Sequence, residues 1–196
     1  MSKNIILASN SPRRKELLRN LGIEFSVVSS EFDEKLDDSM HPYELACHLA
    51  LEKAKDVARK GYDNAIIIAA DTIVIHNKIL GKPKSLNEAY IMLKSLSGNV
   101  HEVVTGVALL DEYNNIQITD YEMTKVYFRK ISDEEINRYI STGESMDKAG
   151  AYGIQGKFAV YIEKIEGDYL NIVGFPVAKF YQTLLKEGID LLTLNK

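Results

Sequence analysis

The chain of 196 residues lacks several features that would assign it to particular classes of protein. It has a single cysteine, Cys47, so an intrachain disulfide is excluded and a reducing cytoplasm is the simplest setting. No apolar run approaches the length of a membrane span, and no signal-peptide pattern opens the sequence. The net charge of -4 argues against polymeric nucleic acid, which is bound through many basic contacts to phosphates. We therefore expect a cytoplasmic protein with neither a membrane nor a nucleic-acid polymer as partner.

Several well-known ligand-binding signatures are also missing. The sequence has no Walker-type or dinucleotide glycine pattern, and no His/Cys spacing that suggests zinc. A mildly acidic chain can still bind a small polyphosphate, which needs only a local positive pocket. The length and the 45% of hydrophobic residues suit one large domain or two small ones with a proper core.

Hydrophobic periodicity predicts a mixed α/β chain. A strand at about 4–9, a helix at 12–21 and a strand at 25–30 would form a first βαβ-like unit. The nearly continuous apolar run 65–75 indicates a central strand covered on both faces. Further on we expect helices at 42–60, 85–96, 132–143 and 176–188, strands at 103–113, 116–129 and 158–165, a hairpin turn at 76–78, and a turn at 166–168 that leads back into 169–173. We expect an elongated mixed sheet flanked by helices, in two lobes around a cleft.

Residues 8–15, Ala-Ser-Asn-Ser-Pro-Arg-Arg-Lys, join the end of an apolar strand to the start of a helix. Ser11 is a good N-cap, and the proline after it suits the first helical position. Backbone N–H groups at a helix start favour anions, and Ser9, Arg13 and Arg14 add hydroxyl and guanidinium groups there. The pattern predicts a phosphate site. The alternative is a capped helix with a solvated basic first turn, although cations are mildly unfavourable at that end.

Asp71 is the sharpest single candidate, because it interrupts an apolar strand where an unpartnered carboxylate would be costly to bury. It must reach the end of the sheet or meet a cation. At a strand end near a phosphate-binding helix start, a carboxylate can hold Mg²⁺ or orient a water molecule. The alternative is a structural salt bridge with a core arginine or lysine.

Four other residues are candidates for a functional site, although the patterns around them are less specific. Lys53 lies in the apolar stripe of the expected long helix, where its ammonium must find an anion or reach water. Lys82 lies in a Gly-Lys-Pro loop, where most lysines are merely exposed. Glu34 would matter only if its acidic loop folds back toward Asp71, giving two hard oxygen ligands for a divalent cation. Gln155 could read the edge of a nucleotide base through its amide, although a glycine-rich turn alone explains its surroundings.

Taken together, these segments resemble the Maf family of nucleoside triphosphate pyrophosphatases, named after septum formation. The matching pieces appear in family order across nearly the whole chain. They are residues 8–14, 70–74, 81–83, 96–98 with His101 and Thr105-Gly106, 147–156 and 173–176. Any one piece is weakly specific, whereas the ordered set is highly specific.

The resemblance implies a single Maf-like domain over 1–196, similar to that of the ITP pyrophosphatases, with a mixed sheet, two lobes and a deep cleft, usually in a homodimer. It implies hydrolysis of a nucleoside triphosphate to the monophosphate and pyrophosphate with a divalent cation such as Mg²⁺, Mn²⁺ or Co²⁺. By the same resemblance, Asp71 is the proton acceptor that activates water, and Glu34 is tied to metal binding.

The resemblance also assigns the residues that contact the substrate. Arg13, Lys53 and Lys82 match positions that contact phosphate. Arg13, Thr72 and Gln155 look like the set of the branch that acts on dTTP and UTP. The branch that prefers 7-methyl-GTP carries different residues at the last two positions.

Two other functions remain open at this stage. The chain could be a nucleotide-binding regulator of cell division, in which occupancy matters and turnover does not. It could also be a pyrophosphatase for deaminated purines such as ITP, although the Ser-Pro-Arg-Arg motif points away from that class. An assay of Asp71→Asn for activity and for cellular phenotype separates the enzyme from the regulator.

Overall fold

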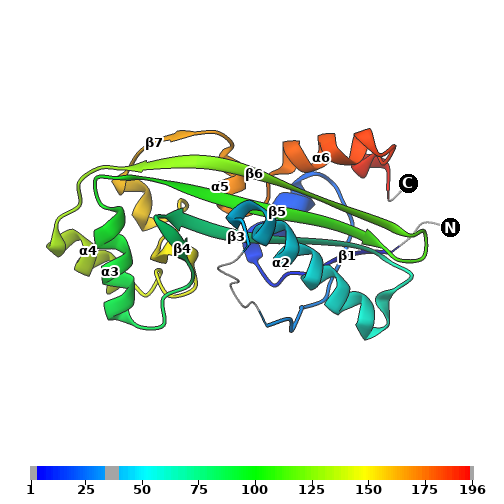
Figure 1. Ribbon diagram of the computed structural model, residues 1–196, viewed down its shortest axis with the longest axis horizontal. Helices are drawn as coiled ribbons and strands as arrows, with labels where there is room; N and C mark the ends of the chain where they lie inside the picture. Colours follow the sequence, from blue (N-terminus) through cyan, green and yellow to red (C-terminus); the bar gives the residue numbers. More distant parts are fainter. Residues whose placement is uncertain (1–3, 34–39, 195–196) are drawn as a thin grey trace. The chain divides into compact units, whose positions relative to one another are not determined.

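The computed structural model describes residues 4–33 and 40–194. Over these residues seven strands form one mixed sheet in the order β2-β1-β3-β5-β6-β7, with β4 paired to β3 (Figure 1). The strands are β1 (Ile5–Leu7), β2 (Ser26–Val27), β3 (Ile66–His76), β4 (Lys78–Leu80), β5 (Val100–Asp111), β6 (Ile116–Phe128) and β7 (Ile162–Glu166). The α-helices are α1 (Pro12–Asn20), α2 (Pro42–Val57), α3 (Leu86–Leu96), α4 (Asp133–Ile140), α5 (Tyr169–Val173) and α6 (Val177–Lys186). The prediction of a mixed α/β chain is confirmed.

The chain divides into two compact units. Unit 1 comprises the described residues of Met1–Asp71, Thr105–Glu122 and Gly174–Lys196, and unit 2 comprises Thr72–Val104 and Met123–Val173. The long strands β3, β5 and β6 contribute residues to both units. The single domain over 1–196 and the cleft stay predictions.

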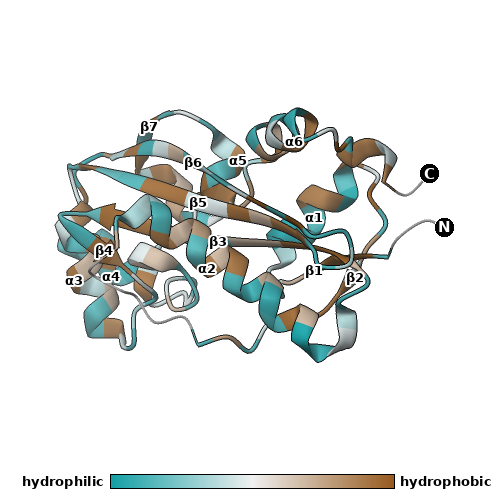
Figure 2. Ribbon diagram, turned by 45° about the vertical axis from the view of Figure 1, so that its right-hand side comes forward, coloured by the Kyte–Doolittle hydropathy of each residue, from teal (hydrophilic) through white to brown (hydrophobic). Residues whose placement is uncertain are grey.

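In unit 1, successive residues of β1, β3 and β5 alternate between two apolar clusters. This is the period of a β-strand with both faces covered, and Figure 2 shows the hydrophobic colouring along β3 and β5. One cluster includes residues of α1 and α6, and the other includes residues of α2. The first contains Ile5, Leu7, Ile66, Ile68, Ala70, Val107 and Leu109, and the second contains Ile6, Ala8, Ile67, Ala69, Ala108 and Leu110.

Gly106 sets the distance between α2 and the sheet. A Cβ atom on Gly106 would lie 2.2 Å from the backbone carbon and oxygen of Ala46. Real Cβ atoms do not approach backbone this closely, so only glycine at this point of β5 lets α2 pack as it does. The alanines Ala46, Ala50 and Ala54 line the same helix and are fully buried. The small residues therefore bring the whole helix, including Lys53, close to the strands.

Unit 2 is built around α3, α4 and a buried aromatic cluster. At the start of α4, Ser132 and Glu135 form a capping box in which each side chain accepts from the backbone N–H of the other residue. At α3 the Ser85 hydroxyl likewise accepts from the Glu88 backbone N–H. The Glu88 carboxylate, however, accepts from the backbone of Lys84 instead of closing the box on Ser85.

In unit 2 the strand predicted at 158–165 is wrong in part, and the segment after the predicted turn is a helix. Residues 157–161 form a 3₁₀ turn, and only Ile162–Glu166 is a strand. Phe158 and Tyr161 are buried whereas Val160 is 69% exposed, which is a spacing of three and not the alternation expected of a strand. The segment after the turn is the helix α5, because the Asp168 carboxylate accepts from the backbone N–H of Leu170.

Two boundaries in unit 1 also differ from the prediction. The strand expected at 25–30 is reduced to Ser26–Val27, which pairs only with the end of the short strand β1. The long helix ends as an α-helix at Val57 and continues as a π-turn over Ala58–Tyr62, where Gly61 has φ 91°.

Candidate functional site

The candidate site in unit 1 lies where the order of the strands reverses. β1 runs parallel to both of its neighbours, β2 on one side and β3 on the other, with Leu7 opposite Ile68. The chain reaches β2 after α1 and β3 after α2, and these helices cover opposite faces of the sheet. Open α/β sheets bind ligands outside the carboxyl ends of their strands at such a point. Ser9 follows the end of β1, and Asp71 lies three residues beyond Ile68 on β3.

Asp71 and Lys53 form a buried ion pair midway along β3, just past the carboxyl end of β1. Asp71 continues the series Ile67 and Ala69, whose side chains face α2. Lys53 reaches it from α2, and its Nζ donates to Asp71 Oδ1. Asp71 is 5% exposed and Lys53 is 8% exposed. The structural salt bridge considered for Asp71 is therefore present, and its partner is the second candidate, Lys53.

The start of α1 is organised around Ser9, which is 8% exposed. Its Oγ accepts from the backbone N–H of Ser11 at 3.2 Å and from Arg14 Nη1 at 3.3 Å. A hydroxyl that already accepts two hydrogen bonds offers a ligand its proton, which is what a phosphate oxygen requires. Ser11 is the N-cap, as predicted, and its Oγ accepts from the backbone N–H of Arg14 at 3.5 Å.

The two arginines of the motif have different surroundings. Arg14 Nε donates to the carbonyl oxygen of Gly174 at 2.8 Å, so this side chain ties α1 to the segment before α6. Arg13 is half-buried and makes no side-chain hydrogen bond or ion pair within the described part of the chain. Of the two guanidinium groups, that of Arg13 is therefore the better placed to receive an anion.

Three predicted residues belong to unit 2. Thr72 is half-buried, and Lys82 and Gln155 are exposed. The loops around them are joined, because the backbone N–H of Gly150 donates to the carbonyl oxygen of Gly81 at 3.1 Å. The Cα of Gly150 also lies against β3, where an added Cβ would be 3.0 Å from Val74. That these residues serve one site with Asp71 stays a prediction.

A divalent cation fits the donor chemistry only in part. In residues 4–33 and 40–194 no group of three or more His, Cys, Asp or Glu side chains could hold a metal ion by itself. Mg²⁺ commonly takes one or two carboxylates together with substrate phosphates and water. Asp71, beside a helix start suited to phosphate, can supply the carboxylate of such a shared site. Glu34, the second expected ligand, lies outside the described residues.

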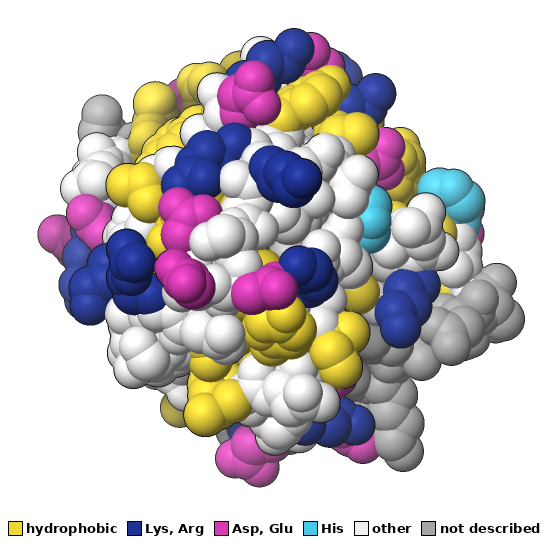
Figure 3. All heavy atoms as spheres, turned by 90° about the vertical axis from the view of Figure 1, so that its left-hand side faces the viewer, with side chains coloured by type: hydrophobic (Ala, Val, Ile, Leu, Met, Phe, Trp, Pro, Cys, Tyr) yellow, Lys and Arg dark blue, Asp and Glu magenta, His cyan; other side chains and the backbone are white. Residues whose placement is uncertain are grey.

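A surface hollow of about 550 Å³ in unit 2 is a poor candidate site. It is lined in part by Lys94, Arg129 and Glu163 and contains no predicted site residue. Its lining has three cations, of which Lys94 is paired with Asp133 and Arg129 with Glu135, while Lys130 shares the lining with the acidic Glu163. Figure 3 shows acidic side chains lying among the basic ones on the face of the molecule that it displays. The hollow therefore presents no concentrated positive charge to a polyphosphate.

Sequence reasoning included Thr105-Gly106 among the matching pieces but did not predict the close packing of Gly106 against α2, nor the environment of His101. His101 is buried, and its Nε2 lies 2.7 Å from Tyr152 Oη. Burial raises the cost of its charged form and lowers its pKa from 6.5 to about 3. The available signal was its spacing of two residues from the apolar Val103, because alternation along a strand places both side chains on one face.

Known relatives cover nearly the whole chain. The family model of Maf, described as Maf-like protein, matches residues 4–187. A dTTP/UTP pyrophosphatase of Alkaliphilus oremlandii is 56% identical over 189 residues, 96% of this chain and 98% of the relative. One of the same description from Alkaliphilus metalliredigens is 53% identical over 184 residues, 94% and 96% of the two chains. The chain belongs to the Maf family, as its motifs predicted.

A solved structure gives a weaker likeness. The nucleoside-triphosphatase / dITP/XTP pyrophosphatase from Mycobacterium abscessus is 16% identical with a TM-score of 0.42, over 65% of this chain and 75% of that one. This likeness adds nothing to the family assignment. Within the described residues, no helix combines the length and the apolar character needed to cross a membrane.

Proposed function

We propose that this protein hydrolyses dTTP and UTP, and modified pyrimidine nucleotides of the same shape, to the monophosphate and pyrophosphate. The relatives described as dTTP/UTP pyrophosphatases match nearly end to end, which favours turnover over the alternative of a regulator of septum formation. The observation that carries the proposal is the buried Asp71–Lys53 pair, which lies midway along β3, just past the carboxyl end of the neighbouring strand β1. It combines a candidate base and a cation beside a helix start that suits phosphate.

Asp71 is the proton acceptor in this proposal. Its carboxylate orients a water molecule, whose oxygen attacks the α-phosphorus while the bond from that phosphorus to the bridging oxygen breaks. The proton of the water passes to the carboxylate, and the electron pair leaves with pyrophosphate. Lys53 holds the carboxylate in place and contributes positive charge where the reaction adds negative charge to the phosphate oxygens.

The start of α1 and the Lys82 loop bind the triphosphate. Arg13 contributes a guanidinium fork that matches phosphate oxygens, and the hydroxyls of Ser9 and Ser11 donate beside the backbone N–H groups of the helix. Arg14 acts mainly by holding Ser9 and the helix start in position, as its bonds to Ser9 and Gly174 indicate. Lys82 supplies an ammonium from an exposed loop.

Thr72 and Gln155 select the base. A pyrimidine presents carbonyl oxygens and an N–H along one edge, and an amide side chain can both donate to and accept from such an edge. Both residues belong to unit 2, in which the loops carrying Gln155 and Lys82 are hydrogen bonded to each other.

A divalent cation, Mg²⁺, Mn²⁺ or Co²⁺, is the cofactor in this proposal, held by Asp71 and Glu34 together with the substrate phosphates. When bound, it neutralises charge on the phosphates and helps to generate the nucleophile. We further propose a cytoplasmic homodimer with one Maf-like domain over 1–196. The single cysteine suits a reducing compartment.

The direct test is a panel of canonical and modified triphosphates assayed for released pyrophosphate with each of the three cations and with a chelator. We expect pyrophosphate from dTTP and UTP in preference to purine triphosphates, and none with the chelator. A preference for ITP or another purine would overturn the assignment of Thr72 and Gln155. Tight nucleotide binding without any pyrophosphate would instead support the regulator.

A further inference from the structure

A buried polar pair in unit 2 has no part in the chemistry proposed above. His101, on β5, is 2% exposed, and Tyr152, in the loop after α4, is 5% exposed. Their side chains meet at 2.7 Å between Nε2 and Oη. The rings also lie edge to face, with centroids 5.3 Å apart. Fifty-one positions separate the two residues in the sequence, so the bond joins a strand to a distant loop.

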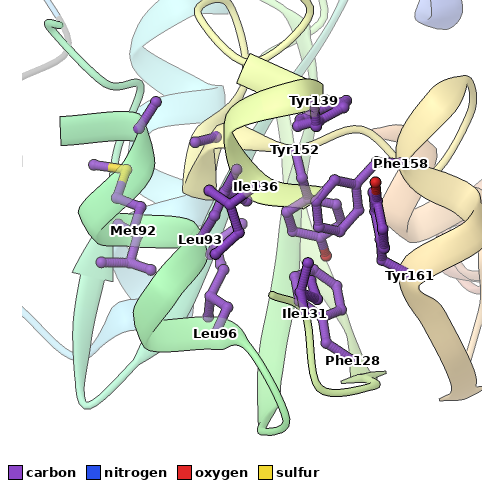
Figure 4. Close-up of a cluster of buried hydrophobic side chains, with 14 of the residues drawn as sticks. Met92, Leu93, Leu96, Phe128, Ile131, Ile136, Tyr139, Tyr152, Phe158 and Tyr161 are labelled. Atoms are coloured by element: carbon purple, nitrogen blue, oxygen red, sulfur yellow. The ribbon is translucent and has the colours of Figure 1, made fainter. Parts of the chain in front are cut away.

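The Tyr152 ring is fixed on several sides. Its centroid lies 4.8 Å from that of Phe128 and 5.1 Å from that of Phe158. Figure 4 shows these rings gathered with Tyr139 and Tyr161 beside α3 and α4. An aromatic ring packed in this way has little freedom to move, and the hydrogen bond to His101 fixes its polar end as well.

The protonation of His101 is fixed by the same surroundings. Nδ1 is buried and has no hydrogen-bond partner within the described residues. A buried N–H without an acceptor is rarer in proteins than an acceptor without a donor. We therefore assign the proton to Nε2, so that His101 donates to Tyr152 Oη. With its lowered pKa the imidazole stays neutral, so it is neither a pH switch nor a general acid.

The backbone before Tyr152 is held in an uncommon conformation. Gly150 and Ala151 have φ 68° and 63°, and left-handed backbone is unfavourable for a residue with a Cβ such as Ala151. Such conformations persist where the surrounding structure over-determines them, and they concentrate at functional sites. Here the fixed side chain of Tyr152 lies on one side of the strained pair. The bond from Gly150 to Gly81 lies on the other.

The pair is therefore connected to two proposed binding residues. Tyr152 precedes Gln155 by three residues, and Gly81, bonded to Gly150, directly precedes Lys82. We propose that His101 and Tyr152 are positioning residues, whose hydrogen bond holds Gln155 and Lys82 in the places where they meet the pyrimidine base and the phosphates. This inference rests on the proposed function and adds two residues that touch no substrate themselves.

The test compares removal of two hydroxyls from one aromatic cluster. Tyr152→Phe deletes the bond to His101. Tyr161→Phe deletes only a long contact, at 3.5 Å, to the carbonyl oxygen of Glu135. We expect Tyr152→Phe to raise KM for dTTP by about five-fold or more with kcat changed less than about two-fold, and Tyr161→Phe to leave both nearly unchanged. His101→Leu should behave like Tyr152→Phe. His101→Gln, which keeps a donor near the position of Nε2, should restore KM.

Equal KM values for Tyr152→Phe and Tyr161→Phe would overturn the inference, even if both variants unfold more easily. If the wild-type protein hydrolyses no triphosphate, the proposed function fails, and amide hydrogen exchange then decides the positioning role separately. Faster exchange at 79–84 and 147–156 in Tyr152→Phe than in Tyr161→Phe supports it. Equal exchange in the two variants contradicts it.

Discussion

Lys53 on α2 and Asp71 on β3 form an ion pair that is almost completely buried in unit 1. Taking two charges out of water is costly, and a buried pair is rarely the most stable solution for a core. Apolar residues of similar volume would often stabilise the fold as well or better. The presence of such a pair just past the carboxyl end of β1, where the parallel pairing with β3 stops, is therefore better explained by chemistry than by stability.

Substituting the two residues singly and together should show that their contributions to stability depend on each other. Lys53→Met leaves the Asp71 carboxylate buried without its ammonium, and we expect a loss of about 3 kcal/mol in the free energy of unfolding. The double variant Lys53→Met/Asp71→Asn should lose less than the sum of the two single variants, by about 1 kcal/mol or more. Urea denaturation measures all three. Additive losses would show that the two side chains do not depend on each other.

Gly106, which lets α2 pack closely on β5, should matter for stability and activity as much as Lys53 and Asp71 do. In Gly106→Ala the new Cβ would meet the backbone of Ala46 at 2.2 Å, so α2 must move outward and carry Lys53 with it. We expect a loss of about 3 kcal/mol and a marked fall in pyrophosphate release. Gly22→Ala is the matched control, because its Cβ meets nothing within 4 Å and adds only the strain of φ 74°. Equal effects would contradict the close-approach explanation.

The two arginines of α1 should have different roles, Arg13 in binding substrate and Arg14 in stabilising the fold. Arg13→Ala removes a guanidinium that makes no side-chain bond among the described residues, so we expect KM to rise by about ten-fold with unchanged thermal stability. Arg14→Ala removes the bonds to Gly174 and Ser9, and we expect the free energy of unfolding to fall by about 2 kcal/mol. Thermal melts and KM for dTTP check both. A stability loss confined to Arg13→Ala would reverse the assignment.

Acid should destabilise the protein partly through His101. Its pKa is about 3 in the folded protein, below the ordinary 6.5, so the unfolded chain binds the proton more readily. This contribution to stability is complete above 6.5 and is lost as the pH falls toward 3. Between about pH 7 and pH 5 it accounts for about 2 kcal/mol. Denaturation of His101→Gln should show a correspondingly weaker pH dependence, and an unchanged slope would contradict the neutral, buried imidazole.

Patterns of apolar residues in the sequence pointed to Asp71 and Lys53 as charged residues in apolar surroundings. The apolar run around Asp71 indicated a buried carboxylate, and the apolar stripe around Lys53 indicated an ammonium that either meets an anion or reaches water. Neither pattern specifies a partner, because helix and strand periodicities act within one element, whereas the pair joins two elements. The bond between His101 and Tyr152 escaped prediction for the same reason.

Where local patterns resemble each other, the prediction of secondary structure was wrong. Phe158 and Tyr161 are buried with a spacing of three, and with their apolar neighbours they were read as an alternating strand. The Asp168 cap, which starts α5, was read as part of a hairpin turn because Gly167 precedes it. Only packing and hydrogen bonding decide such cases.

The most direct test of the central claim follows the oxygen of the attacking water. Wild-type protein is incubated with dTTP and Mg²⁺ in water labelled with heavy oxygen, and the masses of the products are measured by mass spectrometry. Asp71→Asn is the matched variant. Attack at the α-phosphorus predicts the label in the monophosphate and none in pyrophosphate, with turnover lost in Asp71→Asn although nucleotide still binds. Label in pyrophosphate, or full turnover by Asp71→Asn, would contradict the account.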